Sequence, residues 1–280
     1  MPSSLREACP PDYAHAQPGG SQTMKMIGRT VLITGGTSGI GLELAKQLTT
    51  RGNRVIVTGR RADRLEAARQ AVPGLHTFES DVRDPASIEA LYQTVSDRFP
   101  SLDTLVNNAG VMRNIKLDQS YRLDDLTAEI DGNLKGSIWM VQAFLPLLLR
   151  RQGSLIVNVS SGLAFVPFPA APIYSASKAA MHAYTQCLRA QLDGKAVSIV
   201  ELAPPATETP LFRDEFAEQM QGESAMNVSV LVKHAIAGIE AGKPEIRPGL
   251  SNVLKIASRV APSFMLRQMV KLGRPKTSGA

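Results

Sequence analysis

Tyr174 and Lys178 are the residues whose types and spacing most directly suggest chemistry in this chain. Residues four apart share one face of a helix, so the Lys178 ammonium can lie beside the Tyr174 phenol. A phenol has an unperturbed pKa of about 10, and a neighbouring cation favours its ionised form. A tyrosine tuned in this way can protonate a carbonyl oxygen or take the proton of an alcohol.

A glycine-rich turn lies far upstream of this pair, within ITGGTSGIGLELA at residues 33–45. Residues 30–33 are apolar and rich in β-formers, whereas leucines and alanine recur at helical spacing from residue 42 to residue 48. The free N–H groups and the dipole at the start of a helix attract phosphate, and glycine lets phosphate approach the backbone closely. Gly35, Gly39 and Gly41 therefore predict a phosphate-binding turn.

The segments between and beyond these motifs alternate between strand and helix patterns. Apolar β-rich runs lie near residues 30–34, 54–58, 75–80, 102–106, 154–160 and 196–202, with helical patterns between them. Such alternation predicts one α/β domain with a three-layer, doubly wound parallel sheet of the Rossmann type, whose ligands gather at the carboxyl ends of the strands.

Composition fits this fold and excludes several other classes. The 280 residues, 44% of them hydrophobic, are enough for one large α/β domain or two small ones. Cys9 and Cys187 are too few for a disulfide framework or a cysteine-rich metal site, so we expect a cytoplasmic protein without a metal. The net charge is +6, but the basic residues are scattered without an aromatic ladder, which favours an anionic small ligand over nucleic acid.

The two ends of the chain differ in composition from the centre. Residues 1–26 are rich in Pro, Gly, Ser, Gln and Ala, and we interpret them as a disordered extension or an unused upstream start rather than a transit peptide. Residues 27–250 would form the catalytic domain. Residues 251–280 would form a helical extension with interleaved basic residues, which suits either an anionic membrane or a protein surface. Because Pro262 interrupts it, we favour packing on its own domain or on a second subunit.

Three motifs in order carry a family resemblance. They are Thr34-Gly35 with Gly39 and Gly41, then residues 107–110 (NNAG), then residues 174–178 (YSASK). Over residues 28–250 the chain resembles a classical short-chain dehydrogenase/reductase. Residues 203–209 (APPATET) resemble those of a subgroup named for its association with D-alanine transfer operons. The resemblance implies a homodimer or homotetramer.

The resemblance implies a catalytic tetrad of Asn133, Ser161, Tyr174 and Lys178. In this interpretation Ser161 orients the substrate carbonyl, and Asn133 anchors a water molecule that links the lysine to solvent. Lys178 lowers the Tyr174 pKa and holds the nicotinamide ribose. Ser160 is expected to point the other way, because alternate strand residues face opposite sides. A complete tetrad argues against a relative that kept the fold and lost the reaction.

The end of the second predicted strand indicates which dinucleotide binds. Gly59 stands where an acidic residue would accept from the ribose 2′-hydroxyl, and Arg60 and Arg61 follow it. Guanidinium groups there can bind a 2′-phosphate, so NADP(H) is favoured over NAD(H). Arg61 could equally be a solvated residue at the start of a helix, and Ser38 occupies a turn position that is often basic in NADP-binding relatives.

The resemblance also implies a set of cofactor contacts along the carboxyl edge of the sheet. Asn107 is assigned mainly to sheet stabilisation, and Pro205 departs from the family pattern because it removes an N–H group near the nicotinamide. The expected cofactor-binding residues are Gly35, Thr37, Ser38, Gly39, Ile40, Gly41, Arg60, Arg61, Asp81, Val82, Asn108, Ala109, Gly110, Tyr174, Lys178, Pro204, Thr207 and Thr209.

Two apolar segments are candidates for the substrate pocket. Residues 163–173 read LAFVPFPAAPI, and residues 211–226 include two phenylalanines and two methionines. As a pocket wall and a lid they favour an uncharged ketone, aldehyde or alcohol, although they could simply pack together. The sequence thus favours an NADP(H)-dependent oxidoreductase. The alternatives are a non-catalytic cofactor-sensing or scaffold protein on the same fold, and a membrane-peripheral binding protein.

Overall fold

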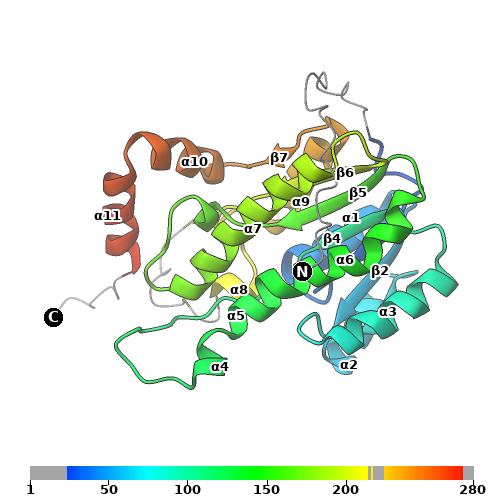
Figure 1. The fold of residues 1–280 in the computed structure, drawn as a ribbon, viewed down its shortest axis with the longest axis horizontal. Coiled ribbons are helices and arrows are strands. Elements are labelled where there is room, and N and C mark those ends of the chain that lie inside the picture. The colour runs from blue at the N-terminus through cyan, green and yellow to red at the C-terminus, as the bar shows by residue number, and fades with distance from the viewer. Residues whose placement is uncertain (1–23, 214–215, 217–223, 274–280) are drawn as a thin grey trace, which may run out of the picture.

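The apolar β-rich runs of the sequence form one sheet of seven parallel strands in the computed structural model, which describes residues 24–213, 216 and 224–273 (Figure 1). The strand order is β3-β2-β1-β4-β5-β6-β7, so the order reverses between β1 and β4. The strands are β1 (Thr30–Ile33), β2 (Arg54–Gly59), β3 (His76–Glu79), β4 (Thr104–Asn107), β5 (Ser154–Val159), β6 (Val197–Leu202) and β7 (Glu245–Ile246).

Side chains that alternate along each strand feed two hydrophobic cores, one on each face of the sheet. Val31 and Ile33 belong to the core under α1, α2 and α9, whereas Leu32 between them belongs to the core under α3, α6 and α7. These helices are α1 (Gly39–Thr50), α2 (Ala62–Ala71), α3 (Pro85–Arg98), α6 (Gly136–Leu149), α7 (Pro172–Gln191) and α9 (Val228–Glu240). The fold is therefore the three-layer, doubly wound arrangement that the sequence predicts.

Short helical elements follow the carboxyl ends of the central strands and complete that edge of the molecule. The chain after β4 leads into three consecutive elements, the chain after β5 into η2, and the chain after β6 into α8. These elements are α4 (Leu123–Leu126), α5 (Ala128–Ile130), η1 (Asp131–Lys135), η2 (Gly162–Ala164) and α8 (Pro210–Arg213).

Local sequence explains where several helices begin. Asp84 caps α3 by accepting a hydrogen bond from the Ala86 N–H group at 3.0 Å, and Pro85 fills the first helical position. Asn227 caps α9 through the Ser229 N–H group at 2.9 Å. Each cap satisfies an N–H group that has no partner within its own helix.

The C-terminal region forms two helices, α10 (Leu250–Val260) and α11 (Pro262–Gly273), joined at Ala261. Proline is tolerated at the first helical position, so Pro262 starts a second helix where it cannot continue the first. Both helices lie at one end of the molecule in Figure 1. Within the described residues, no helix has both the length and the apolarity needed to cross a bilayer.

The structure differs from the sequence expectation at two points. The strand β7 was not predicted, because two residues carry no alternating pattern. Met26 is 1% exposed and its N–H group donates to Glu240 at 3.1 Å, so the packed core includes a residue that the sequence placed in the N-terminal extension. Residues 1–23 of that predicted extension lie outside the described part of the chain.

Candidate active site

The glycine turn joins β1 to α1 and fits tightly against the end of β4. Gly35 and Gly39 have φ angles of +65° and +52°, which side chains other than glycine rarely adopt. A Cβ atom at Gly41 would lie 2.5 Å from both the Asn108 amide nitrogen and the Gly35 carbonyl oxygen. Glycine at these positions therefore lets the turn pass directly beside β4.

Thr34 ties this turn to the residues after β4. Its hydroxyl accepts hydrogen bonds from the N–H groups of Asn108 and Ala109, both at 3.0 Å. The Asn108 side chain donates in return to the carbonyls of Thr34 and Gly35, at 3.0 and 3.1 Å. Thr34 is absent from the predicted cofactor contacts, although it belongs to the glycine motif that carries the family resemblance.

The start of α1 keeps its hydrogen-bond donors available. The first N–H groups of a helix have no partner within that helix, and the Ser38 hydroxyl does not cap them. The Thr209 side chain lies beside Gly39, because a Cβ atom on that glycine would be 3.3 Å from Thr209 Cγ2. The turn therefore has the donor set and the positive dipole end that a phosphate group requires.

Tyr174 and Lys178 lie one turn apart on α7, both buried. The Lys178 ammonium donates to the Val159 carbonyl at the end of β5, at 2.8 Å, and lies 5.6 Å from the centre of the Tyr174 ring. The Ser161 hydroxyl is hydrogen-bonded to the Tyr174 phenol. Three of the four predicted catalytic side chains are therefore brought together at the carboxyl edge of the sheet.

Burial controls the protonation of this group. Desolvation raises the pKa of Tyr174 to about 12, against the opposite effect of the Ser161 hydrogen bond. Desolvation also lowers the pKa of Lys178 to about 8. The net shift of the phenol pKa in the chain alone is therefore upward, opposite to the lowering that we expected from Lys178.

Asn133, the fourth predicted residue, lies in the π-helical segment η1 and faces the same region. Its side-chain oxygen accepts from the Val111 N–H group at 2.8 Å, and its amide donates to the Val111 carbonyl at 2.9 Å and to Ser177 at 3.1 Å. A Cβ atom on Gly110 would lie 3.1 Å from the Asn133 oxygen and 3.6 Å from the Lys178 nitrogen. A side chain at residue 110 would therefore contact both of these groups.

Two residues that sequence reasoning missed complete the surroundings of Tyr174. Glu129 is fully buried, accepts from the Arg113 N–H group at 3.0 Å, and contributes to raising the Tyr174 pKa. Ser177 donates to the Tyr174 carbonyl at 2.7 Å and thereby links Asn133 to α7. The available signal for Glu129 was its position four residues before Asn133.

The two candidate arginines, which follow β2, differ in their contacts. Arg61 is exposed and pairs with Asp63 at 2.5 Å, as a residue at the start of a helix would. Arg60 is also exposed and makes no hydrogen bond within the described residues. Its charge helps Arg83, which pairs with Asp81 at 2.6 Å, to hold the Asp81 pKa below its usual value. Arg60 is therefore the cation that lies free near the predicted adenine side.

Two further contacts explain residues at that end of the site. A Cβ atom on Gly59 would lie 2.8 Å from Thr37 Cγ2, so any larger side chain at residue 59 would crowd the glycine turn. A Cβ atom on Gly136 would lie 2.6 Å from the Val82 carbonyl, which places Val82 against the start of α6.

The segment after β6 lies over the site in part. The Pro204 carbonyl accepts from the Gly162 N–H group at 2.8 Å, and the Thr207 hydroxyl donates to the Pro205 carbonyl at 2.8 Å. Pro205 thus lies in a turn that is stabilised by the hydrogen bond from Thr207 to the Pro205 carbonyl. Ile40, at the start of α1, packs on the core beneath that helix, and this packing accounts for an apolar residue at the position.

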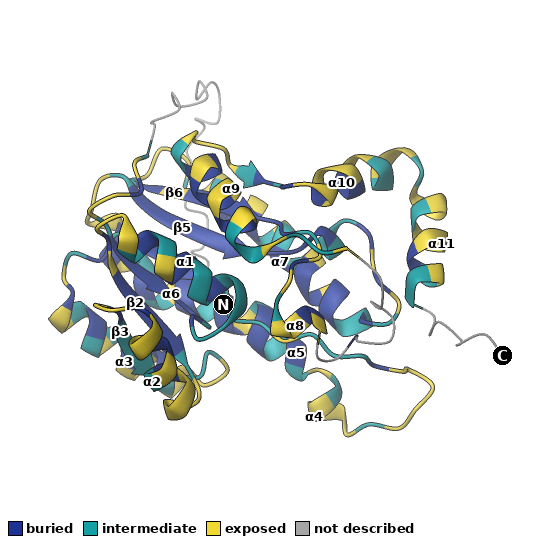
Figure 2. Ribbon diagram, turned by 180° about the vertical axis from the view of Figure 1, so that it is seen from behind, coloured by how far each residue is buried: buried dark blue, intermediate teal, exposed yellow. Residues whose placement is uncertain are grey.

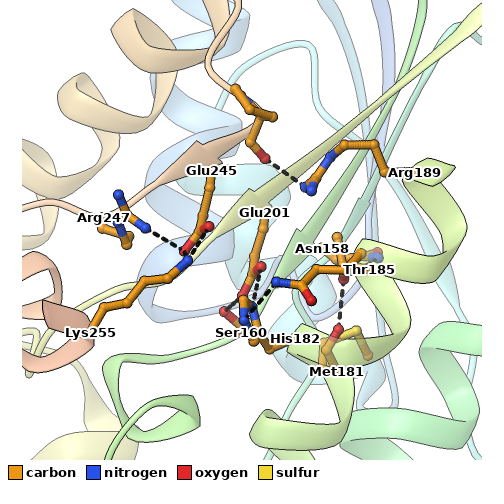
Figure 3. Close-up of polar contacts among 12 residues, drawn as sticks. Asn158, Ser160, Met181, His182, Thr185, Arg189, Glu201, Glu245, Arg247 and Lys255 are labelled. Atoms are coloured by element: carbon orange, nitrogen blue, oxygen red, sulfur yellow. Dashed lines mark hydrogen bonds and ion pairs between the residues drawn. The ribbon is translucent and has the colours of Figure 1, made fainter. Parts of the chain in front are cut away.

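Asn107 and Ser160 serve the sheet, as expected from the sequence. The Asn107 amide donates to Asn158 on β5 at 2.9 Å. Ser160 points away from Ser161 and donates to the buried Glu201 at 2.5 Å, where His182 Nδ1 also lies 2.7 Å away (Figure 3).

Glu245 lies near this pair, and its oxygens with those of Glu201 and a His182 nitrogen fall within 4.8 Å of one another. That spacing could suit a metal ion. However, Lys255 and Arg247 pair with Glu245 at 2.5 and 2.9 Å, as Figure 3 shows. Lys255 and Arg247 therefore already neutralise the Glu245 carboxylate that a metal ion would need as a ligand.

An apolar cluster adjoins Tyr174. Its largest members come from the two segments that the sequence singled out: Phe168 lies 5.8 Å from Phe216 between ring centres, and Phe212 is 8% exposed. Leu254 of α10 and Met269 of α11 join the same cluster. Met220, which was predicted to belong to the lid, lies outside the described residues.

Comparison with known proteins identifies the family. The family model described as short chain dehydrogenase matches residues 29–220. The chain is 38% identical over 249 residues to the uncharacterized oxidoreductase DltE of Bacillus subtilis, covering 88% of this chain and 98% of that protein. It is 31% identical to the NADP-dependent 3-hydroxy acid dehydrogenase YdfG of Salmonella typhi, covering 74% and 85%.

Among solved structures, the fold resembles a short chain dehydrogenase from Burkholderia cenocepacia in complex with NADP. The TM-score is 0.76 at 24% identity, with 88% of this chain and 99% of that chain covered. The protein therefore belongs to the short-chain dehydrogenase family of oxidoreductases and has its Rossmann-type fold.

The raised phenol pKa is open to a direct test. Since burial favours the neutral form, Tyr174 in the protein alone should remain protonated at about pH 10, where half of a free phenol is ionised. The ultraviolet phenolate absorbance of the wild type should then equal that of Tyr174→Phe at this pH. Excess phenolate in the wild type, with circular dichroism showing that both proteins are folded, would contradict the assignment.

Proposed function

We propose that the protein is an NADP(H)-dependent oxidoreductase that transfers a hydride between the nicotinamide and a carbonyl or secondary alcohol of a mostly apolar small molecule. The observation that carries the proposal is the meeting of the Tyr174 phenol, the Ser161 hydroxyl and the Lys178 ammonium at the sheet edge. Carbonyl reduction needs a proton donor next to an oxygen-binding group, and these side chains supply both.

The residues divide the chemistry between them. Ser161 and Tyr174 would bind the carbonyl oxygen through their hydroxyl groups, and the nicotinamide, when bound, supplies or accepts the hydride. Because Tyr174 is protonated in the chain alone, it is ready to donate its proton to that oxygen during reduction. In alcohol oxidation Tyr174 takes the proton, which requires additional positive charge near the phenol to offset its burial.

Lys178 places a positive charge of the chain itself beside the phenol, and the additional charge would come from outside the chain. Its pKa of about 8 leaves the ammonium mostly protonated near pH 7, and its hydrogen bond to Val159 fixes its position beside the ring. Asn133 and this ammonium both lie beside Gly110, and we place the route of proton exchange with solvent there.

The glycine turn fits a dinucleotide. The start of α1 would hold the pyrophosphate, since its N–H groups and dipole favour an anion there. Asp81 and Val82 would border the adenine, and Arg60 would bind the 2′-phosphate, whereas Arg61 is engaged by Asp63. The name of the 31% identical YdfG, an NADP-dependent enzyme, supports the same cofactor for this chain.

The apolar cluster around Tyr174 supports an uncharged substrate. Its walls come from residues 163–173 and from Phe212 and Phe216, and they bring no charged side chain of their own to the phenol. Such a surface favours a ketone, an aldehyde or an alcohol over a charged acid. A non-catalytic role on this fold would not require the phenol, hydroxyl and ammonium groups to be buried together.

Arg60 and Arg61 provide a matched pair for testing cofactor choice. Arg60→Ala should weaken NADPH binding by about 1.5–3 kcal/mol, the range for hydrogen bonds to a charged group, and should hardly change NADH binding. Arg61→Ala should leave both affinities unchanged, because its guanidinium pairs with Asp63. The measurement is fluorescence titration of each variant with both nucleotides. Equal losses for NADPH and NADH in Arg60→Ala would refute the 2′-phosphate role.

Tyr174→Phe tests the catalytic assignment. The change removes only the proton-transferring hydroxyl, so kcat should fall by at least about 100-fold while NADPH affinity stays nearly constant. Lys178→Met should reduce both turnover and affinity, because Lys178 is assigned to the phenol and to the ribose. Steady-state kinetics on a carbonyl compound that the wild type reduces gives the answer. Turnover close to wild type in a folded Tyr174→Phe protein would rule the mechanism out.

A further inference from the structure

The helix α10 presents an apolar face to the outside of the molecule. Its four exposed apolar side chains are Leu250, Val253, Ile256 and Val260, which are 58%, 54%, 58% and 81% exposed. They recur every three or four residues and therefore share one side of the helix. We call these four residues the outer face of α10. A surface helix normally turns its apolar side inward, so this orientation is the reverse of the usual one.

The opposite side of α10 fixes this orientation. Ser251, Leu254 and Lys255 are buried, and Lys255 pairs with Glu245 of β7 at 2.5 Å. Ser251 and Leu254 pack against Gly162, since a Cβ atom there would lie 2.8 and 3.1 Å from their side chains. The helix therefore cannot bury its outer face without breaking the Lys255–Glu245 pair and this packing.

The whole net charge of the protein lies in the same segment. Residues 250–280 contain six basic residues and no acidic one, and the formal net charge of the chain is +6. The other 249 residues carry equal numbers of basic and acidic side chains and are neutral overall. The six basic residues are Lys255, Arg259, Arg267, Lys271, Arg274 and Lys276.

The helix α11 continues the same combination of apolar and basic groups. Phe264 and Leu266 are 51% and 42% exposed, and Arg267 and Lys271 are exposed beside them. Its other side packs on the domain through Met269. Exposed residues run along both α10 and α11 in Figure 2, and both helices lie at one end of the molecule.

We propose that α10 and α11 dock on the surface of an anionic lipid bilayer. An apolar helix face flanked by lysine and arginine lies in the interface of such a membrane, with its apolar side among the acyl chains and its cations at the headgroups. A second copy of the chain fits less well, because the same face of two copies would bring the exposed Arg259, Arg267 and Lys271 of each copy together. The charge distribution therefore favours a membrane over a second subunit, whereas Leu254, Lys255 and Met269 pack on the chain's own domain, one of the two arrangements that we expected from the sequence.

The proposal is tested on the full-length protein by flotation with vesicles of phosphatidylcholine alone or with about one-third phosphatidylglycerol. The protein should float only with the anionic vesicles and should be released at high salt. Val253→Ser with Ile256→Ser should abolish flotation, and Arg267→Gln with Lys271→Gln should weaken it by about fivefold for each cation removed. Leu123→Ser removes an apolar side chain that is 83% exposed on α4, and it should have no effect.

Equal binding to neutral vesicles, or none to anionic ones, would overturn the proposal. A fall in mass by light scattering for Val253→Ser with Ile256→Ser, without vesicle binding by the wild type, would identify the outer face as a subunit contact instead. NADPH titration of each variant separates this test from the proposed activity, since these residues lie outside the catalytic group and affinity should not change.

Discussion

The site depends on one buried interaction, the hydrogen bond from the Lys178 ammonium to the Val159 carbonyl. It joins the helix that carries Tyr174 to the end of β5, two residues before Ser161, and so sets the distance between the phenol and the hydroxyl that we propose bind one oxygen. Burying a cation with a single carbonyl partner is costly, and the lowered Lys178 pKa records that cost. The arrangement is understandable if the ammonium is kept there for its charge rather than for stability.

Desolvation also keeps the Tyr174 phenol in its protonated form. Tyr174 has a pKa near 12 in the chain alone, so the protein favours the form that donates a proton. Glu129 adds to this bias from a fully buried position. In the proposed mechanism, reduction is thus the direction for which the protein alone prepares its acid, and oxidation requires charge from outside the chain. The physiological direction would then follow the redox state of the dinucleotide pool as well as the site.

Much of this arrangement was predictable from local sequence, because local rules govern it. The β-rich residues 30–33 ahead of the glycines predicted the position of the turn, and the spacing of four between Tyr174 and Lys178 predicted their common face. Glu129 and the pairing of Arg61 with Asp63 were not predictable in the same way, since they depend on which helix packs where and on competition between nearby charges. The π-helical segment around Asn133 likewise follows from tertiary contacts to Val111 and Ser177. The two-residue strand β7 is too short for any pattern.

The central claim is that the buried phenol and hydroxyl reduce a carbonyl with NADPH. Its most direct test is to mix the wild-type protein with NADPH and a panel of uncharged aldehydes and ketones, and to measure NADPH consumption together with alcohol formation. We predict equimolar loss of NADPH and gain of alcohol for at least one apolar compound in the panel. Saturable NADPH binding without consumption across the panel would contradict the account and favour a cofactor-sensing role on the same fold.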